Sequence, residues 1–372
     1  MSETSYRSIC ICGGGSLGHA IAATAGNQGC HISILTGHPE RWDKQITAFD
    51  CRDNVIQSKL IQVSSKAHEV VPKADLILLC VPGYLIESTL KKIQPYLSPR
   101  QMVGSVVCSN GFFWIARSVV GKNISLFGFQ RVPFICRVRE YGKSVDIKGY
   151  KSQLKIGGLN NPYLNGLASF FTKIFQTPTS VLNHFLEATL TNSNPILHPA
   201  RIYAMLSAQT EETFDKEFLF YEEWDDKSSE ILIACDDELH AIIQKLPVNP
   251  KEIPPLLTYY ESTDAATLTQ KIRSIAAFKG IKMSMKPVKN GFVIDYSNRY
   301  FTEDIPFGLL IIKSLGVLTD TATPTIDNIL CWIQTQMGKE YLSNGEMTGM
   351  DIVHSGIIQN YRVHSEELFK KG

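Results

Sequence analysis

Ile9-Cys10-Ile11-Cys12-Gly13-Gly14-Gly15-Ser16-Leu17-Gly18 is the stretch that decides the fold of the first half of this chain. Its apolar residues predict a buried strand over 8–12, and its glycines predict a tight turn. Residues 17–28 have helical spacing, and a second apolar strand follows Gly29 over 31–35. Strand, glycines, helix and strand in this order form a βαβ unit, and this context makes the glycine pattern a specific prediction of dinucleotide binding.

Each glycine of the turn has a physical reason to be there. Gly13 permits the tight turn, Gly15 lets the backbone approach a pyrophosphate, and Gly18 allows the helix to pack closely on the strand. The pyrophosphate is expected at the helix N-terminus, beside Ser16 and Leu17, because free N–H groups and the helix dipole favour an anion there. A glycine turn that binds nothing is the alternative.

The end of the second strand bears on which dinucleotide is bound. A carboxylate usually stands there in NAD-binding domains to hold the ribose hydroxyls, whereas here Leu35 is followed by Thr36-Gly37-His38-Pro39-Glu40-Arg41. Thr36, His38 and Arg41 are expected to receive a 2′-phosphate, because a guanidinium pairs well with phosphate oxygens. The sequence therefore favours NADP over NAD, with a solvated Arg41 as the alternative reading.

Two later strands end in further candidates for the cofactor site. Val81 and Pro82 follow an apolar run over 76–81, and Asn110 follows one over 102–108. Ligands of open α/β sheets lie at the carboxyl ends of the strands, so Val81 and Pro82 are expected to line the cofactor and Asn110 to meet the nicotinamide. Asn110-Gly111 is also a common plain turn.

Nearly unbroken apolar strands joined by helices predict an α/β fold, a doubly wound and mainly parallel sheet covered on both faces. Segments 125–127, 145–147 and 151–156 are expected to add later strands. The run 177–180, Thr-Pro-Thr-Ser, marks the expected boundary between a Rossmann-type domain at 1–178 and a mainly α-helical domain at 179–372. In the second domain a helix is expected to start at Thr323-Pro324 and stop near Gly338.

The composition of the 372 residues supports two domains, with 44% hydrophobic and 20% charged residues. The net charge of +1 has no long run of one sign, which argues against a nucleic-acid partner. The polar N-terminus Met1 to Arg7 does not resemble a signal peptide, and no apolar stretch has the length of a membrane span. We therefore expect a cytoplasmic protein without a membrane partner.

The nine cysteines predict reduced thiols in the core and no disulfide framework. They lie mostly in apolar runs, such as those of Cys80, Cys108, Cys235 and Cys331. Cys10 and Cys12 lack the spacing of metal ligands, so no metal site is expected.

Two segments of the second half carry candidate chemistry. In Asn194-Pro195-Ile196-Leu197-His198-Pro199 the prolines are expected to end a helix that begins near Val181 and to keep His198 off a regular helix, ready for proton transfer. The alternative is a structural histidine.

The second segment is Asn298-Arg299-Tyr300-Phe301-Thr302-Glu303-Asp304-Ile305-Pro306, before an apolar helix over 307–315. Arg299 has the chemistry to grip a substrate carboxylate, and Asp304 to orient a histidine. Equally, Asp304 has the chemistry to cap the helix, and Arg299 to pair with Asp295 on the surface.

Together these motifs resemble the octopine/nopaline (opine) dehydrogenases. The resemblance runs in order through nearly the whole chain, and the Asn-Pro-x-x-His-Pro and Arg-Tyr-x-x-x-Asp-x-Pro segments are its most distinctive parts. It rests on the glycine turn at 13–18, the segments 194–199 and 299–306, Phe220-Tyr221-Glu222 and Thr323-Pro324-Thr325-Ile326-Asp327.

The resemblance implies an NAD(P)H-dependent reductive condensation of an α-keto acid, such as pyruvate, with the amino group of an amino acid. It makes His198 the acid/base, Asp304 its charge partner and Arg299 a carboxylate anchor, with Asn194 and Tyr221 lining the substrate cleft. Members often contribute a glutamine to the keto-acid pocket, for which this chain offers Trp114 or Gln130.

Two alternatives stay open at this point. A ketopantoate-reductase-like or hydroxy-acid dehydrogenase would share the first domain, although no segment here resembles the lysine helix of that family. A non-catalytic NADP-binding sensor is the alternative from another class. The sequence does not decide the amino acid, the keto acid, the use of the product as a metallophore or a redox sink, or the assembly, for which a homodimer is one option.

Overall fold

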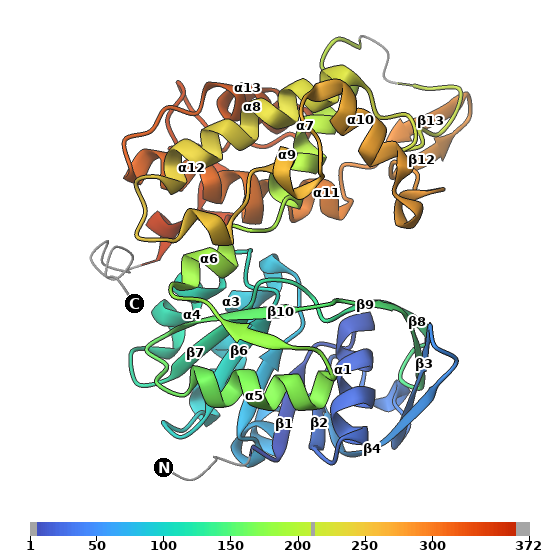
Figure 1. Ribbon diagram of the computed structural model, residues 1–372, viewed down its shortest axis with the longest axis vertical. Coiled ribbons are helices and arrows are strands. Elements are labelled where there is room, and N and C mark those ends of the chain that lie inside the picture. Colours follow the sequence, from blue (N-terminus) through green and yellow to red (C-terminus); the bar gives the residue numbers. More distant parts are fainter. Residues whose placement is uncertain (1–5, 210–212, 362–372) are drawn as a thin grey trace. The chain divides into compact units, whose positions relative to one another are not determined.

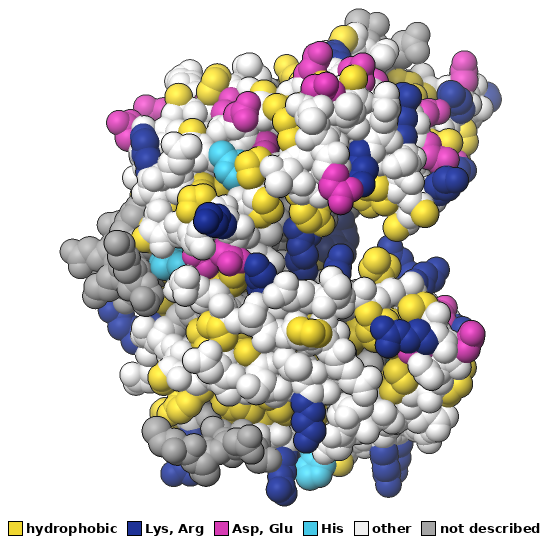
Figure 2. Space-filling model, viewed as in Figure 1, with side chains coloured by type: hydrophobic (Ala, Val, Ile, Leu, Met, Phe, Trp, Pro, Cys, Tyr) yellow, Lys and Arg dark blue, Asp and Glu magenta, His cyan; other side chains and the backbone are white. Residues whose placement is uncertain are grey.

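The structure is a computed structural model that describes residues 6–209 and 213–361. Most of the polar N-terminal segment considered above lies outside the described residues. The chain forms two compact units that meet in sequence at Thr191 and Asn192 (Figure 1). Among the described residues, no helix is both long enough and apolar enough to span a bilayer. Acidic and basic side chains are interspersed with uncharged ones on the face shown in Figure 2.

The first unit is built on an 11-stranded sheet with β1 (Ser8–Cys12) near its centre. β1 pairs in parallel with β2 (His31–Leu35) on one side and with β5 (Leu76–Leu79) on the other. Because the chain moves outward from β1 in both directions, the carboxyl end of β1 is a topological switch point, where α/β sheets bind ligands. The turn after β1 therefore lies at the expected place for a cofactor.

The remaining strands extend this arrangement on both sides. β6 and β7 continue the parallel series beyond β5, and β4 pairs in parallel with β2. Antiparallel pairs occur toward the sheet edges, so the sheet is mainly parallel, as expected. The bounds are β3 (Gln45–Asp50), β4 (Val55–Ser64), β6 (Met102–Val106), β7 (Ser125–Phe129), β8 (Phe134–Glu140), β9 (Ser144–Tyr150), β10 (Leu154–Leu159) and β11 (Thr179–Val181).

Helices cover both faces of this sheet (Figure 1). α1 (Ser16–Asn27) packs with α5 (Leu164–Phe175), whereas α3 (Gly83–Ile93) packs with α4 (Phe112–Val120). The strand interior is apolar, with Ile9, Ile11 and their β2 neighbours fully buried. The doubly wound fold predicted from the sequence is confirmed.

The boundary between the units lies later than residue 178, where the sequence placed it. β11 pairs in parallel with β10, and the short helix α6 (Phe185–Thr189) packs on β10 as well. These contacts hold residues 179–191 in the first unit. The helix expected from near Val181 is therefore wrong, because two short elements occupy that stretch.

The second unit is mainly α-helical, as expected, with one two-stranded β-ribbon (Figure 1). α8 (Asp226–Ile243) packs against α7 (Asn194–Leu206), α10 (Ala265–Ser274) and α13 (Pro324–Gln336). Its other elements are α9 (Leu256–Tyr259), β12 (Met285–Val288), β13 (Gly291–Ile294), α11 (Arg299–Thr302), a π-helical turn (Ile305–Leu309) and α12 (Leu310–Leu318).

All nine cysteines are free thiols. Cys331 is exposed on α13, so its assignment to the core is wrong. An apolar neighbourhood in sequence does not decide which side of an amphipathic helix a residue occupies.

Candidate active site

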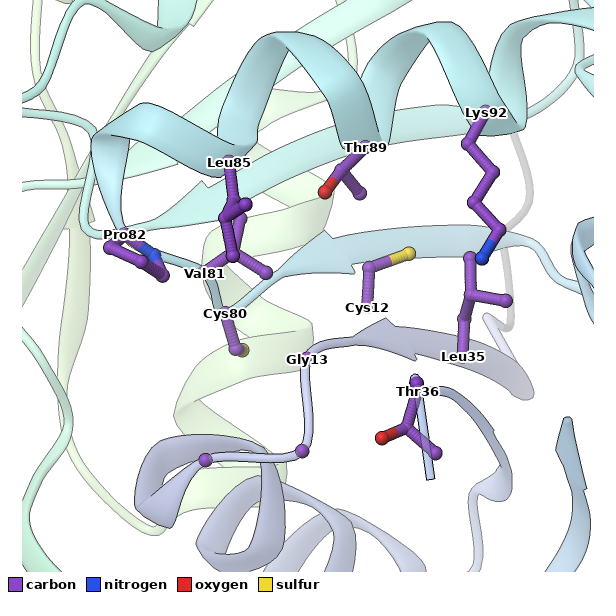
Figure 3. Close-up of a pocket in the computed structure, with 13 residues that line it drawn as sticks. Cys12, Gly13, Leu35, Thr36, Cys80, Val81, Pro82, Leu85, Thr89 and Lys92 are labelled. Carbon is purple, nitrogen blue, oxygen red and sulfur yellow. The ribbon is translucent and has the colours of Figure 1, made fainter. Parts of the chain in front are cut away.

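A pocket of about 330 Å³ lies at the carboxyl ends of β1, β2 and β5 (Figure 3). It is the place where the sheet topology predicts a nucleotide. Its lining contains the glycine turn, the end of β2 and one side of α3: Cys12, Gly13, Gly14, Gly15, Leu35, Thr36, Gly37, Cys80, Val81, Pro82, Leu85, Thr89 and Lys92.

The glycines of this turn meet the spatial demands that the sequence implied. Gly13 has φ +125°, and a Cβ there would come 2.5 Å from the carbonyl oxygen of Cys80. A Cβ on Gly18 would collide with the carbonyl oxygen of Gly13. At Gly15, the N-cap of α1, a Cβ would point into open space with no atom within 4 Å. This space beside a helix N-terminus is what a pyrophosphate requires, so the turn fits a dinucleotide.

The residues after β2 do not all reach the pocket. Thr36 is buried in its lining, and its hydroxyl is 3.2 Å from the Tyr141 hydroxyl. His38 is exposed and lies 3.4 Å from Glu40, and the Arg41 guanidinium lies over the Tyr141 ring, 4.5 Å from its centre. His38 and Arg41 are absent from the pocket lining, which instead contains a cation that sequence reasoning missed, Lys92.

The other predicted cofactor residues also have defined places. Val81 and Pro82 line the pocket, whereas Ser16 and Leu17 do not. The Ser16 hydroxyl accepts the backbone N–H of Val138 at 3.0 Å, and Leu17 packs against the core.

Asn110 is buried, and its Oδ1 has no hydrogen-bond partner among the described residues. A buried acceptor without a partner is costly, so a donor from a ligand would stabilise this side chain. The carboxamide of a nicotinamide provides such a donor.

In the second unit, α7 carries His198 within its helical turns, and the expectation that the prolines keep it off a regular helix is wrong. Pro195 occupies the first turn, where its missing N–H would be unbonded in any helix. Pro199 removes only the bond to the carbonyl of Pro195, and the helix continues to Leu206.

His198 is held at both ring nitrogens. Its Nδ1 is 2.7 Å from Oδ2 of Asp304, and its Nε2 is 2.8 Å from the Tyr221 hydroxyl. The His198 and Asp304 side chains are only 8% and 13% exposed. Asp304 makes no side-chain capping bond to the helix that follows, and its carboxylate contacts His198 instead. This hydrogen bond is the contact that an orienting role of Asp304 would require.

Aromatic rings enclose the two hydrogen bonds. The Tyr300 ring lies 4.3 Å from the His198 ring, and Tyr221 stacks on Phe278 with ring centres 4.1 Å apart. Burial, followed by the neighbouring Tyr300, raises the pKa of Tyr221 well above its usual value. Tyr221 is therefore a neutral hydroxyl at ordinary pH, a donor to one group and an acceptor from another.

Arg299 begins α11, five positions before Asp304, and it is exposed. Its guanidinium makes no hydrogen bond or ion pair with the described residues. The surface partner considered for it, Asp295, instead binds Lys286 at 2.7 Å. A guanidinium without a protein partner suits a carboxylate ligand.

The other substrate candidates lie outside this cluster of side chains. Asn194 is exposed at the first position of α7. In the first unit, Gln130 is buried and donates to the Thr191 hydroxyl at 3.0 Å, and Trp114 is buried in α4.

The fold and the site define a two-domain oxidoreductase that uses a nicotinamide dinucleotide. Residues 181–337 match the model of the NAD/NADP octopine/nopaline dehydrogenase α-helical domain, and residues 8–109 match an NADP oxidoreductase model described as coenzyme F420-dependent. Octopine dehydrogenase of Pecten maximus is 28% identical over 383 residues, covering 95% of this chain and 96% of the relative. Tauropine dehydrogenase of Arabella iricolor is also 28% identical, over 95% of this chain and 97% of its own length.

Solved structures agree with these relatives. Octopine dehydrogenase with NADH and L-arginine matches with a TM-score of 0.85 and 25% identity, over 96% of both chains. Yersinopine dehydrogenase with bound NADP⁺ matches in fold, with a TM-score of 0.68 at 11% identity, over 95% of this chain and 98% of its own. Along nearly its whole length the chain is therefore similar to opine dehydrogenases, and residues 181–337 match the α-helical domain of that family.

Proposed function

We propose that this protein joins an α-keto acid to the amino group of an amino acid and reduces the resulting imine with NADPH. The products are an N-(carboxyalkyl) amino acid, water and NADP⁺. The observation that carries the proposal is the Asp304–His198–Tyr221 chain of hydrogen bonds, with the Arg299 guanidinium on the same short segment as Asp304. This arrangement supplies a proton for the keto oxygen and a cation for the carboxylate of a keto acid.

The proton balance of the reaction defines what the site must do. An ammonium group, a ketone and NADPH give a secondary ammonium group, water and NADP⁺ only if one further proton is taken up. That proton goes to the oxygen that leaves as water. The cofactor supplies the hydride, and the protein has to supply the acid.

His198 has the contacts of such an acid. The Asp304 carboxylate accepts the Nδ1 proton, which leaves Nε2 as the atom that gains and loses the reactive proton. The Nε2 proton reaches the leaving oxygen through the Tyr221 hydroxyl, which gives its own proton to that oxygen and takes the Nε2 proton in return.

Tyr221 connects His198 to the substrate oxygen. When His198 is neutral, the Tyr221 hydroxyl donates to Nε2. When Nε2 carries a proton, Nε2 donates to the Tyr221 oxygen, and the Tyr221 O–H must turn to another acceptor. The carbonyl oxygen of the keto acid is that acceptor in our proposal. The Arg299 guanidinium holds the carboxylate of the same molecule through two parallel hydrogen bonds.

We further propose that NADP is preferred over NAD. The pocket lining contains no Asp or Glu at the end of β2 to hold two ribose hydroxyls, and no carboxylate there would repel a phosphate. The glycine turn, Val81 and Pro82 would hold the body of the cofactor, and Asn110 its carboxamide.

The test follows NADPH oxidation by absorbance with pyruvate alone, and again with each of a panel of amino acids. We expect oxidation that depends on one of the amino acids. Equal rates with pyruvate alone would contradict the proposal and favour a hydroxy-acid dehydrogenase.

A further inference from the structure

One side of α3 faces the nucleotide pocket in a regular pattern. Leu85, Thr89 and Lys92 line the pocket at positions i, i+4 and i+7 of this helix (Figure 3). This spacing places the three side chains along one helical face. From the start of α3 toward its end, the face presents an apolar group, a hydroxyl and a cation.

The cation is directed at the ends of β1 and β2. In Figure 3 the Lys92 side chain extends from α3 toward Leu35 at the end of β2, and Thr36 lines the same pocket. Its charge also acts on Cys12, the last residue of β1. The hydrogen bond with Cys10 and burial raise the pKa of the Cys12 thiol well above its usual value, and Lys92 opposes this rise. Lys92 therefore lies over the place where the adenosine ribose of a dinucleotide binds.

Lys92 has no competing protein partner among the described residues. Its neighbour Lys91 forms an ion pair with Glu87 at 2.6 Å, whereas no hydrogen bond or ion pair holds the Lys92 ammonium. Lys92 is also the one charged side chain of the pocket lining. A cation that faces a pocket without carboxylates favours an anionic group on the ligand.

The earlier candidate for the same task lies elsewhere. The Arg41 guanidinium lies over the Tyr141 ring, outside the lining of the pocket. Leu85 is 40% exposed although it is a large apolar side chain, and it offers cover for an adenine ring. The α3 face thus matches an adenosine that carries a phosphate near the end of β2.

We propose that Lys92 binds the 2′-phosphate of NADP(H), with the Thr36 hydroxyl beside it, and that this contact produces the preference for NADP over NAD. The inference rests on the proposed cofactor preference and not on the proposed reaction. It transfers the phosphate-binding role from the loop after β2 to α3.

The experiment measures binding of two probes to the full chain by titration calorimetry, without either substrate. The probes are adenosine 2′,5′-bisphosphate and adenosine 5′-monophosphate, which differ by the 2′-phosphate alone. Lys92→Gln is expected to weaken the bisphosphate about tenfold and to leave the monophosphate nearly unchanged, because one charge-assisted contact is lost. Lys91→Gln, one position away and paired with Glu87, is the matched control and should change neither.

Three results would overturn the inference. Equal weakening of both probes would place Lys92 at the 5′-phosphate instead. Unchanged binding of both probes in Lys92→Gln would show that Lys92 does not contact the adenosine phosphates. A tenfold weakening of the bisphosphate in Arg41→Gln and not in Lys92→Gln would assign 2′-phosphate binding to Arg41. Melting temperatures of all variants show whether the chain remains folded. Because no keto acid or amino acid is present, failure here is separate from failure of the proposed reaction.

Discussion

Asp304→Asn tests the electrostatic core of the proposed mechanism. The substitution keeps the shape of the side chain and removes the charge that lies 2.7 Å from Nδ1 of His198. Opposite charges whose centres lie about 4 Å apart interact by about 4 kcal/mol at an effective dielectric constant of about 20. If the protonated histidine lost all of this interaction energy, turnover would fall by about 10³-fold.

The Asp304→Asn variant retains part of this interaction energy. The Asn oxygen still accepts the Nδ1 proton, and a neutral hydrogen bond retains about 1 kcal/mol. We therefore expect kcat to fall by about 10²-fold. The affinity for NADPH should stay unchanged, because the cofactor residues belong to the other unit.

The assay measures amino-acid-dependent NADPH oxidation across pH, together with NADPH binding by fluorescence. Asp295→Asn is the matched control, since Asp295 is a carboxylate in the same region that binds Lys286 rather than His198. A kcat for Asp304→Asn within about threefold of the unsubstituted protein would refute the charge-partner role.

The remaining predictions concern three further side chains. Tyr221→Phe should lower kcat by about 10²-fold with NADPH binding intact, because it removes the hydroxyl between Nε2 and the substrate oxygen; undiminished turnover would exclude Tyr221 from proton transfer. Arg299→Lys should raise KM for the keto acid about tenfold with a smaller change in kcat, since a lysine lacks the paired donors; an unchanged KM would dismiss the anchor. Burial raises the pKa of Asp236 to about 6, so the folding penalty of its carboxylate is absent below about pH 4, grows as pH rises from about 4 to about 6, and is complete above that. Asp236→Asn should then add about 1–2 kcal/mol to the free energy of unfolding at pH 8 and nothing at pH 4 in urea titrations, and an equal effect at both would contradict this.

The elements that the sequence predicted well are those with local signals. β1 and β2 have the predicted bounds, and α1 differs by one residue at each end, because apolar runs and glycines mark them directly. β11 was missed, since its first two residues, Thr179 and Ser180, belong to the Thr-Pro-Thr-Ser run that indicates a turn. Because β11 pairs with β10, the first unit extends beyond residue 178.

The helix through His198 was missed for a different reason. Two prolines in six residues predict a break, yet one lies in the first turn and the other costs a single backbone bond. Packing of α7 against α8 outweighs this cost.

Only some residues of the candidate site could be predicted from the sequence. His198 and Asp304 are 106 positions apart, and their pairing came from the resemblance to a family and not from spacing. The contact between Tyr221 and Nε2 could not be read from the sequence, because it depends on how α7 packs beside the chain that follows it. Lys92 was missed because the sequence around a lysine on an exposed helix does not indicate whether it faces a pocket. Its position seven residues after Leu85, on the same helical face, could be read from the sequence.

Identification of the product tests the central claim most directly. The protein is incubated with NADPH, pyruvate and the amino acid that supports the fastest oxidation, and the products are analysed by mass spectrometry. We predict a secondary amine that contains the carbon skeletons of both substrates, formed in equal amount to the NADP⁺. Lactate in that amount, with the amino acid unconsumed, would contradict the account.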